Sequence, residues 1–332
     1  AINILAGGIL EQFVPAAVDN YALLVAILVA VNLSLFSQPS VLDGWVMRLK
    51  SQGAHINYGL TRGAGSLAYA ITSIIAGIVL SRLGLPAMFP MLLGFVSVAA
   101  VFVLLVDEKP VSLPETVTAI EAEGLATPIY RNAKYLVFVL LSTVLFVGVS
   151  ASLTFYPLLL QDAGGGTADL GLALGLCALS EFPVMLLSNR LLRRFRDTTL
   201  LLAAMGFYVL RIVLFFAIKD ADGLVWAQLT NSITYGIFLP TSVHYISRIT
   251  PVRMRATALS LASSMYMGLG GFLGSLSGGF IIKSLGIRPL FGMAAALAAV
   301  IAAAFGAVLL LSKGNGSDLF TKEKKSSTIS HN

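Results

Sequence analysis

Long apolar runs separated by short polar segments dominate the hydropathy pattern of this chain. A helix that crosses a bilayer needs about 20 predominantly apolar residues. In hydrocarbon such a segment must also satisfy its own backbone hydrogen bonds, which favours helices. The pattern therefore predicts an all-α membrane protein with nine full spans, at about 21–47, 62–84, 86–106, 134–160, 167–190, 198–218, 223–248, 255–283 and 287–311.

The first apolar run is too short to cross a membrane, because it ends at Leu10 before Glu11 and Gln12. It also lacks the basic flank that is typical of a signal peptide. The sequence opens with Ala1 rather than methionine. We therefore interpret this run as the end of a helix whose beginning is absent from the sequence.

Composition agrees with a bilayer as the main solvent. The chain is 57% hydrophobic and 11% charged, whereas soluble domains carry about 25% charged residues. Its net charge of +6 is better explained by cytoplasmic loops than by a nucleic-acid partner. Cys177 is the only cysteine and the three histidines lie far apart in sequence, so we expect no metal site and no cofactor.

Basic residues in alternate loops predict the orientation. Seventeen lysines and arginines lie in loops on one side and four in loops on the other, which makes the first side cytoplasmic. This places the C-terminus inside a multi-pass protein of the cell membrane. A long polar linker at 107–133 precedes six spans, a plan typical of transporters built from two parallel repeats. The expected organisation is 1–106 for the N-terminal half, 107–133 for the cytoplasmic linker, 134–312 for the C-terminal half and 313–332 for the tail.

Glu181 and Arg211 are charged residues far from the ends of predicted spans, where a charge costs at least about 2.5 kcal/mol and needs a reason. Glu181 and Arg211 occupy consecutive antiparallel spans, and their depths differ by roughly 6 Å at 1.5 Å per residue. We expect a pair that faces a polar cavity, with a purely structural ion pair as the alternative. Asp43 and Arg62 form a second candidate pair, with a solvated loop pair as the alternative.

Small residues are concentrated in the predicted span at 255–283, which includes Gly268, Gly270, Gly271, Gly274 and Gly278. Small residues let membrane helices approach closely. We interpret them mainly as a helix-packing surface, and alternatively as a surface that moves during transport.

Several short motifs resemble one known family. They are Gln38-Pro39-Ser40-Val41-Leu42-Asp43, Tyr58-Gly59-Leu60-Thr61-Arg62, Gly65-Ser66, Glu181-Phe182-Pro183, Arg211, the run 228–238 and Arg255-Ala256-Thr257-Ala258. In order and spacing they resemble the lactose-permease-like branch of the major facilitator superfamily, which includes sugar, nucleoside and phenylpropionate permeases. The resemblance implies two six-helix halves, of which about the first two and a half helices would be missing here.

The resemblance also implies roles for individual residues. Asp43 and Arg62 match a substrate-binding carboxylate and arginine, Asp43 with a shift of one residue, and Tyr69 matches an aromatic residue that stacks on the sugar ring. Glu181 matches the carboxylate that links substrate and proton sites, and Arg211 matches its arginine neighbour. The stretch 188–196 is similar to the gating loop of the superfamily, with Arg190, Arg193 and Arg194 as its basic residues, although Arg196 stands where glycine is common.

Two departures from the family pattern bear on mechanism. Asn231 and Thr234 occupy positions where the permeases have a histidine and a proton-carrying glutamate, and neither side chain titrates near neutral pH. Asn231 is expected to bind substrate. Either Glu181 or Asp43 carries the proton, or transport is uncoupled.

The expected function is secondary active transport of a small polar solute (a sugar, a nucleoside or a small organic acid) by alternating access, with proton symport and as a monomer. The alternatives are a uniporter, an exporter, a membrane-embedded enzyme or a non-transporting remnant.

Overall fold

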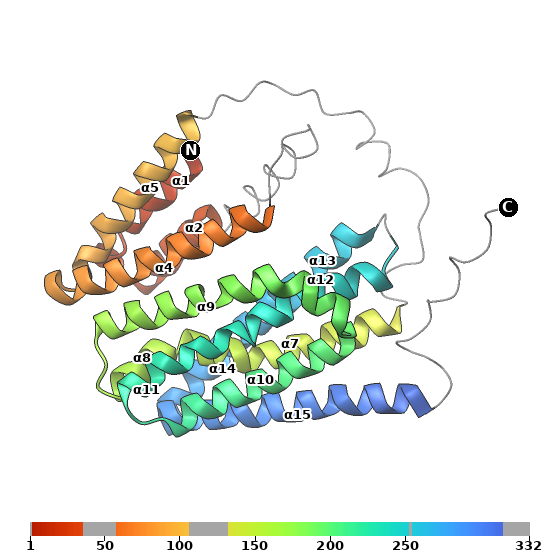
Figure 1. Ribbon diagram of the computed structural model, residues 1–332. Coiled ribbons are helices and arrows are strands. Elements are labelled where there is room, and N and C mark those ends of the chain that lie inside the picture. Colours follow the sequence, from red (N-terminus) through yellow and green to blue (C-terminus); the bar gives the residue numbers. More distant parts are fainter. Residues whose placement is uncertain (1, 36–57, 106–131, 252–253, 315–332) are drawn as a thin grey trace. The chain divides into compact units, whose positions relative to one another are not determined.

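The computed structural model describes residues 2–35, 58–105, 132–251 and 254–314 (Figure 1). All elements in these ranges are helices. The chain forms two compact units, one of residues 1–62 and 75–124 and the other of residues 63–74 and 125–332. Each unit is described separately below.

The first unit is built from apolar helices joined by tight turns: α1 (Ile2–Glu11), a 3-10 turn (Pro15–Ala17), α2 (Tyr21–Leu35), parts of α4 (Tyr58–Leu83), a 3-10 turn (Leu85–Ala87) and α5 (Met88–Leu105). Helix α1 packs closely on α5 at Gly8, where an added Cβ atom would lie only 3.0 Å from Val96 Cγ1. The Gln12 side chain fastens the same contact by donating from Nε2 to the Phe89 carbonyl at 2.7 Å. The turn between α4 and α5 uses Gly84 at φ 82°, a conformation that favours glycine.

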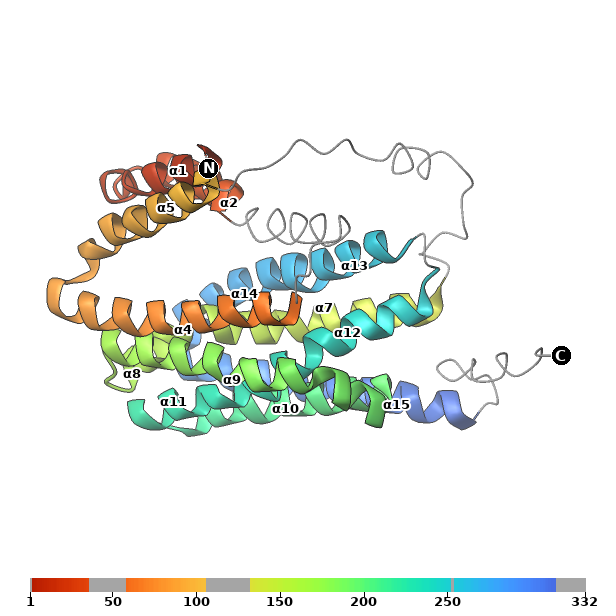
Figure 2. The same ribbon diagram turned by 45° about the horizontal axis from the view of Figure 1, so that its top comes forward.

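The second unit contains most of the described chain. Its elements beyond residues 63–74 of α4 are α7 (Ala133–Thr154), α8 (Tyr156–Asp162), α9 (Thr167–Arg194), α10 (Asp197–Ala217), α11 (Ala221–Ala227), the 3-10 segment η4 (Gln228–Ser232), α12 (Tyr235–Ile249), α13 (Arg255–Ser263), the π segment η6 (Ser264–Leu269), α14 (Gly270–Leu285) and α15 (Ile287–Gly314). Figure 2 shows α13 and α14 as parts of one long rod.

Helices α7 and α10 form the centre of this unit. Helix α7 packs on α14 and α15, whereas α10 packs on α15 and α12 (Figure 1). Aromatic rings fill the space between them, with the Phe146 centroid 5.0 Å from that of Tyr266 and 5.2 Å from that of Phe238. Tyr208 and Tyr266 are both buried in this core. The rings therefore pack against each other at the distances that aromatic pairs prefer.

The small residues of α14 bring it against α7, as the sequence predicts. A Cβ atom at Gly274 would lie 2.4 Å from the Val147 carbonyl oxygen, and one at Gly270 would lie 2.9 Å from the Thr143 carbonyl oxygen. The two backbones are thus too close for any larger side chain at these positions.

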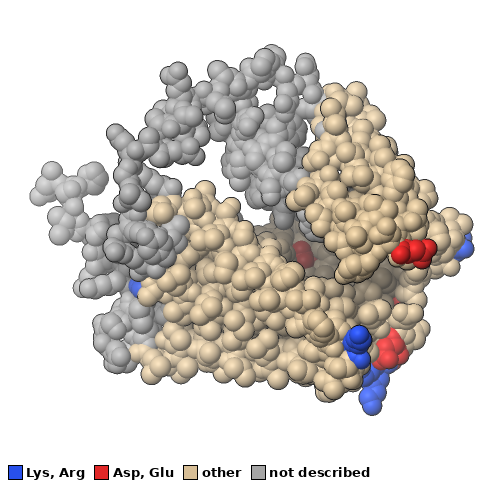
Figure 3. All heavy atoms as spheres, turned by 180° about the vertical axis from the view of Figure 1, so that it is seen from behind, with Lys and Arg blue, Asp and Glu red and all other residues tan. Residues whose placement is uncertain are grey.

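Seven helices in the described ranges are long and apolar enough to cross a membrane, and they lie in seven of the nine predicted spans. The predicted span 21–47 extends beyond the described residues. The prediction of one continuous span at 223–248 is wrong, because the helix is interrupted at η4. Uncharged residues cover most of the described surface that is visible in Figure 3, as expected for a surface in contact with lipid.

Candidate functional site

The interruption between α11 and α12 contains several hydroxyl residues. Its hydroxyl side chains bond to nearby carbonyl groups: Thr230 Oγ1 donates to Ala227 O at 2.6 Å, Ser232 Oγ to Leu229 O at 2.8 Å and Thr234 Oγ1 to Asn231 O at 3.1 Å. Such bonds compete with the regular helix and satisfy carbonyls that it would otherwise pair. A membrane helix is therefore able to break here without leaving those carbonyls exposed to hydrocarbon.

Residues 228–234, between α11 and α12, are called the interrupted segment below. Three of their polar side chains contact one buried guanidinium. Arg211 of α10 is 2% exposed. Its Nη2 donates to Gln228 Oε1 at 2.5 Å, and its Nη1 donates to Asn231 Oδ1 and, at 3.3 Å, to Thr234 Oγ1. The guanidinium also lies 5.3 Å from the ring centroid of Phe215, within the range of a cation–π contact. Arg211 thus fixes the segment from a neighbouring helix.

Asn231 connects this guanidinium to Glu181 of α9. Its Oδ1 accepts from Arg211 while its Nδ2 donates to Glu181 Oε1. The sequence predicted that Glu181 and Arg211 come together, and the structure places both in one hydrogen-bonded network. Asn231 stands between them, so an amide links the two charges.

Gln228 was not identified as a site residue from the sequence. It is 2% exposed, and its amide accepts from Arg211. One signal was present: Gln228 lies three residues before Asn231, and residues three apart share a helix face.

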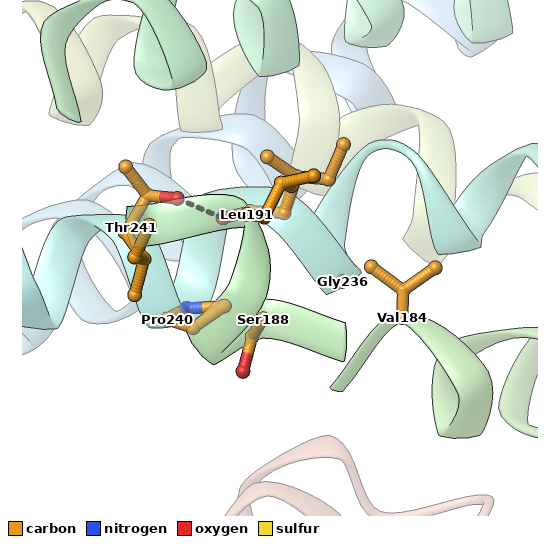
Figure 4. Close-up of a pocket in the computed structure, with 8 residues that line it drawn as sticks. Val184, Ser188, Leu191, Gly236, Pro240 and Thr241 are labelled. Atoms are coloured by element: carbon orange, nitrogen blue, oxygen red, sulfur yellow. Dashed lines mark hydrogen bonds between the residues drawn. The ribbon is translucent and has the colours of Figure 1, made fainter. Parts of the chain in front are cut away.

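A narrow crevice lies beside the interruption, between α9 and α12 (Figure 4). Its lining residues are Val184, Ser188, Leu191, Leu192, Gly236, Ile237, Pro240 and Thr241. Pro240 has no backbone N–H, so the carbonyl of Gly236 lacks its usual helical donor. The Thr241 hydroxyl donates within its own helix, to the Ile237 carbonyl at 2.7 Å. The crevice is too narrow to hold a water molecule. Glu181 lies on the same helix, three residues before the first lining residue, Val184.

The remaining predicted site residues have different outcomes. Asp43 and the side chain of Arg62 lie outside the described residues. Tyr69 lies on α4 with its side chain 54% exposed. The stretch 188–196, which resembles the gating loop, is helical in its first part, because α9 continues to Arg194. Arg190, Arg193 and Arg194 are exposed on its last turns, where positive charge is favourable to the helix dipole.

A second polar cluster, also missed from the sequence, joins one end of α10 to one end of α12. Asp197, the first residue of α10, is buried, and its Oδ2 lies 3.1 Å from His244 Nδ1 and 3.3 Å from Arg248 Nε. Both partners belong to α12 and are about half exposed. The carboxylate lies at a helix N-terminus and Arg248 in the last turn of its helix, so each also complements a helix dipole.

We expect Asp197→Asn to lower the free energy of unfolding by about 1 kcal/mol. The amide keeps the shape of the side chain but loses its charge, and the exposure of both partners limits the effect. Thermal unfolding in detergent measures it, with Asp222→Asn on the exposed start of α11 as the matched control. Equal melting temperatures for the two variants would show that the cluster does not stabilise the α10–α12 contact.

The described residues contain no group of three histidine, cysteine or carboxylate side chains suited to a metal ion.

Comparison with known protein families identifies one match. A sequence model described as the MFS_1 like family matches residues 5–293. The maltose permease of Geobacillus stearothermophilus is 25% identical over 269 residues, which are 81% of this chain and 67% of that protein. The uncharacterized transporter YwbF of Bacillus subtilis (strain 168) is 22% identical over 264 residues, 79% of this chain and 64% of that protein. The chain thus spans about two thirds of the length of these relatives.

Among solved structures, a mutant of the nucleoside transporter NupG superposes with a TM-score of 0.74 at 17% identity, covering 92% of this chain and 81% of that one. At this identity the similarity establishes the fold.

Proposed function

This chain belongs to the MFS_1 like family of membrane transporters, and from that premise we propose that it is a secondary active transporter of a small polar solute. The observation that carries the proposal is the Glu181–Asn231–Arg211 network at an interrupted helix. Ionisable residues within spans mark solute and ion pathways. Interrupted helices form the binding sites of many transporters, because their free backbone and polar side chains face the solute.

The solute we propose is a sugar, a nucleoside or a small organic acid. The names of a maltose permease and of the nucleoside transporter NupG support this class. We assign solute binding to Asn231 of the interrupted segment and, following the family resemblance, to Asp43, Arg62 and Tyr69. Beyond its bonds to Arg211 and Glu181, the Asn231 amide has a second N–H and a second acceptor lone pair for a hydroxyl-rich solute.

Proton coupling is the second part of the proposal, with Glu181 as the proton-carrying group. Neither Asn231 nor Thr234 titrates near neutral pH, whereas Glu181 is a carboxylate that shares a hydrogen-bonded network with Arg211. Binding of solute and proton would shift the balance between two access states by their differential affinity. The alternative within the same fold is a uniporter or an exporter, in which the network has a structural role.

We propose that the protein acts as a monomer in the cell membrane, with its C-terminus in the cytoplasm. The 17-to-4 distribution of basic residues supports this orientation. It places the Asp197 cluster and the arginines at the end of α9 on the cytoplasmic side. It also places the junction of α10 and α11 on the outer side.

The test is uptake by the full-length protein in proteoliposomes with an imposed pH gradient, using sugars, nucleosides and small carboxylates. We expect gradient-driven accumulation in the wild type, a loss of at least tenfold in Glu181→Gln, and retained solute exchange in that variant. The exposed Asp222→Asn serves as the carboxylate-to-amide control. Uptake that ignores the gradient in the wild type and in Glu181→Gln would contradict symport and favour a uniporter.

A further inference from the structure

The charge balance around Arg211 has a distinctive feature. A guanidinium stays protonated in proteins, yet its three hydrogen-bond acceptors on the interrupted segment, Gln228, Asn231 and Thr234, are all neutral. A buried charge that lacks a counter-charge is strongly destabilising. The neutral acceptors satisfy the geometry of the guanidinium but leave its charge to be balanced elsewhere.

Glu181 is the carboxylate that the described hydrogen bonds connect to Arg211, through Asn231. Other carboxylates of the surrounding helices are engaged at helix ends. Asp169, near the start of α9, accepts from Gly166 N at 2.7 Å and lies 12 residues before Glu181, or roughly 18 Å along the helix. Asp220 caps α11 by accepting from Gly223 N at 2.7 Å, and Asp162 pairs with Arg288 at 3.1 Å.

Gln228 occupies the place where a competing carboxylate would have the largest effect. Its Oε1 lies 2.5 Å from Arg211 Nη2, and a glutamate of the same length would present an ionised oxygen there. The Arg211–Gln228 hydrogen bond is already charge-assisted on the arginine side, and an ionised oxygen would add the attraction of an opposite charge at close range. A glutamate would therefore neutralise Arg211 directly and remove its dependence on Glu181.

We propose that Gln228 is a positioning residue whose neutral amide holds the Arg211 guanidinium in place while reserving its positive charge for Glu181. The charge state of Glu181 then decides whether the buried network is balanced. The inference has two parts. The first, that Gln228 leaves the charge of Arg211 to be balanced by Glu181, depends only on the contacts described above. The second, that protonation of Glu181 therefore changes the stability of the interrupted segment during transport, rests on the proposed function.

A charge-rescue cycle in the full-length protein tests the electrostatic part, with the melting temperature in detergent as the readout. We expect Glu181→Gln to lower the melting temperature by about 5 °C, because it leaves Arg211 unbalanced. Adding Gln228→Glu should restore at least half of that loss. The same glutamine-to-glutamate change at the exposed Gln161, added to Glu181→Gln, should restore none of it.

Three results would overturn the proposal: no destabilisation in Glu181→Gln, no rescue by Gln228→Glu, or equal rescue by Gln161→Glu. If Glu181→Gln fails to fold, the yield of monodisperse protein replaces the melting temperature, and the double variant is then expected to recover it.

Transport separates positioning from a purely structural role. In the Glu181→Gln, Gln228→Glu double variant we expect restored stability and retained solute exchange but no gradient-driven accumulation, because the balancing carboxylate has moved away from the coupling position. Accumulation at the wild-type level in this double variant would overturn the role of Gln228 in coupling. A wild type that transports none of the solutes would contradict the proposed function instead, and the melting-temperature cycle would still decide the electrostatic part.

Discussion

Replacing Arg211 by leucine is expected to abolish transport and to lower the free energy of unfolding by about 3 kcal/mol or more. The guanidinium donates to three buried side-chain oxygens, those of Gln228, Asn231 and Thr234, and each of them would lose its donor. Removing one partner from a buried charged network leaves the others unsatisfied, at a cost of about 3–5 kcal/mol. Proteoliposome uptake and thermal unfolding in detergent measure the two effects.

The conservative variant Arg211→Lys separates charge from geometry. An ammonium keeps the positive charge but lacks the planar fork that reaches Gln228 and Asn231 together, so we expect only partial recovery of stability. Arg255→Leu, at an exposed arginine of α13, is the matched control and should leave the melting temperature nearly unchanged. Wild-type stability in Arg211→Leu would mean that the interrupted segment keeps its conformation without the guanidinium.

Replacing Gly274 by alanine is expected to destabilise the second unit by about 3 kcal/mol. The new Cβ atom would lie 2.4 Å from the Val147 carbonyl oxygen and 3.0 Å from Ala151 N. Both atoms belong to the α7 backbone, which has no rotamer through which to move away, so the two helices would have to separate. Overpacking of this kind typically costs about 1–3 kcal/mol, and rigid backbone contacts place Gly274 at the upper end. Thermal unfolding in detergent gives the effect directly.

Gly271→Ala provides the control on the same helix. A Cβ atom there would meet Ser150 Oγ at 3.8 Å, an ordinary van der Waals contact, and alanine favours the helix over glycine by about 1 kcal/mol. We therefore expect unchanged or slightly higher stability. If Gly274→Ala and Gly271→Ala behave alike, the close approach of α14 to α7 does not limit packing at Gly274.

The membrane fold was largely predictable from the sequence. Apolar runs predicted seven of the spans that the structure contains, because hydrocarbon imposes length and helicity on each segment independently of its neighbours. The glycines at 255–283 predicted a close helix contact for a similar local reason, and Gly270 and Gly274 make it. Glu181 and Arg211 were predictable as partners because each was a costly charge inside a span.

The details of the site were not predictable in the same way. The span at 223–248 was expected to be one helix, because its apolar run is long enough to cross a membrane. The arginines that follow residue 189 were expected in a loop, although arginine readily extends a helix at its C-terminus. Charged residues inside apolar runs stand out in the sequence, and neither Gln228 nor Asp197 meets that description. Gln228 is neutral, and Asp197 lies at the end of an apolar run.

The sequence by itself determined that the chain lies in a lipid bilayer, where most of its helices lie, and which family it resembles. Each of these depends on composition or on short motifs, which do not require knowledge of the tertiary contacts. Only the tertiary structure decided that Asn231 stands between Glu181 and Arg211, and that Gln228 and Thr234 complete the set of oxygens around the guanidinium. These contacts join α9, α10 and the interrupted segment. Hydrogen-bond partners so far apart along the chain are selected by helix packing and by the need to satisfy each buried polar group, which no local pattern specifies.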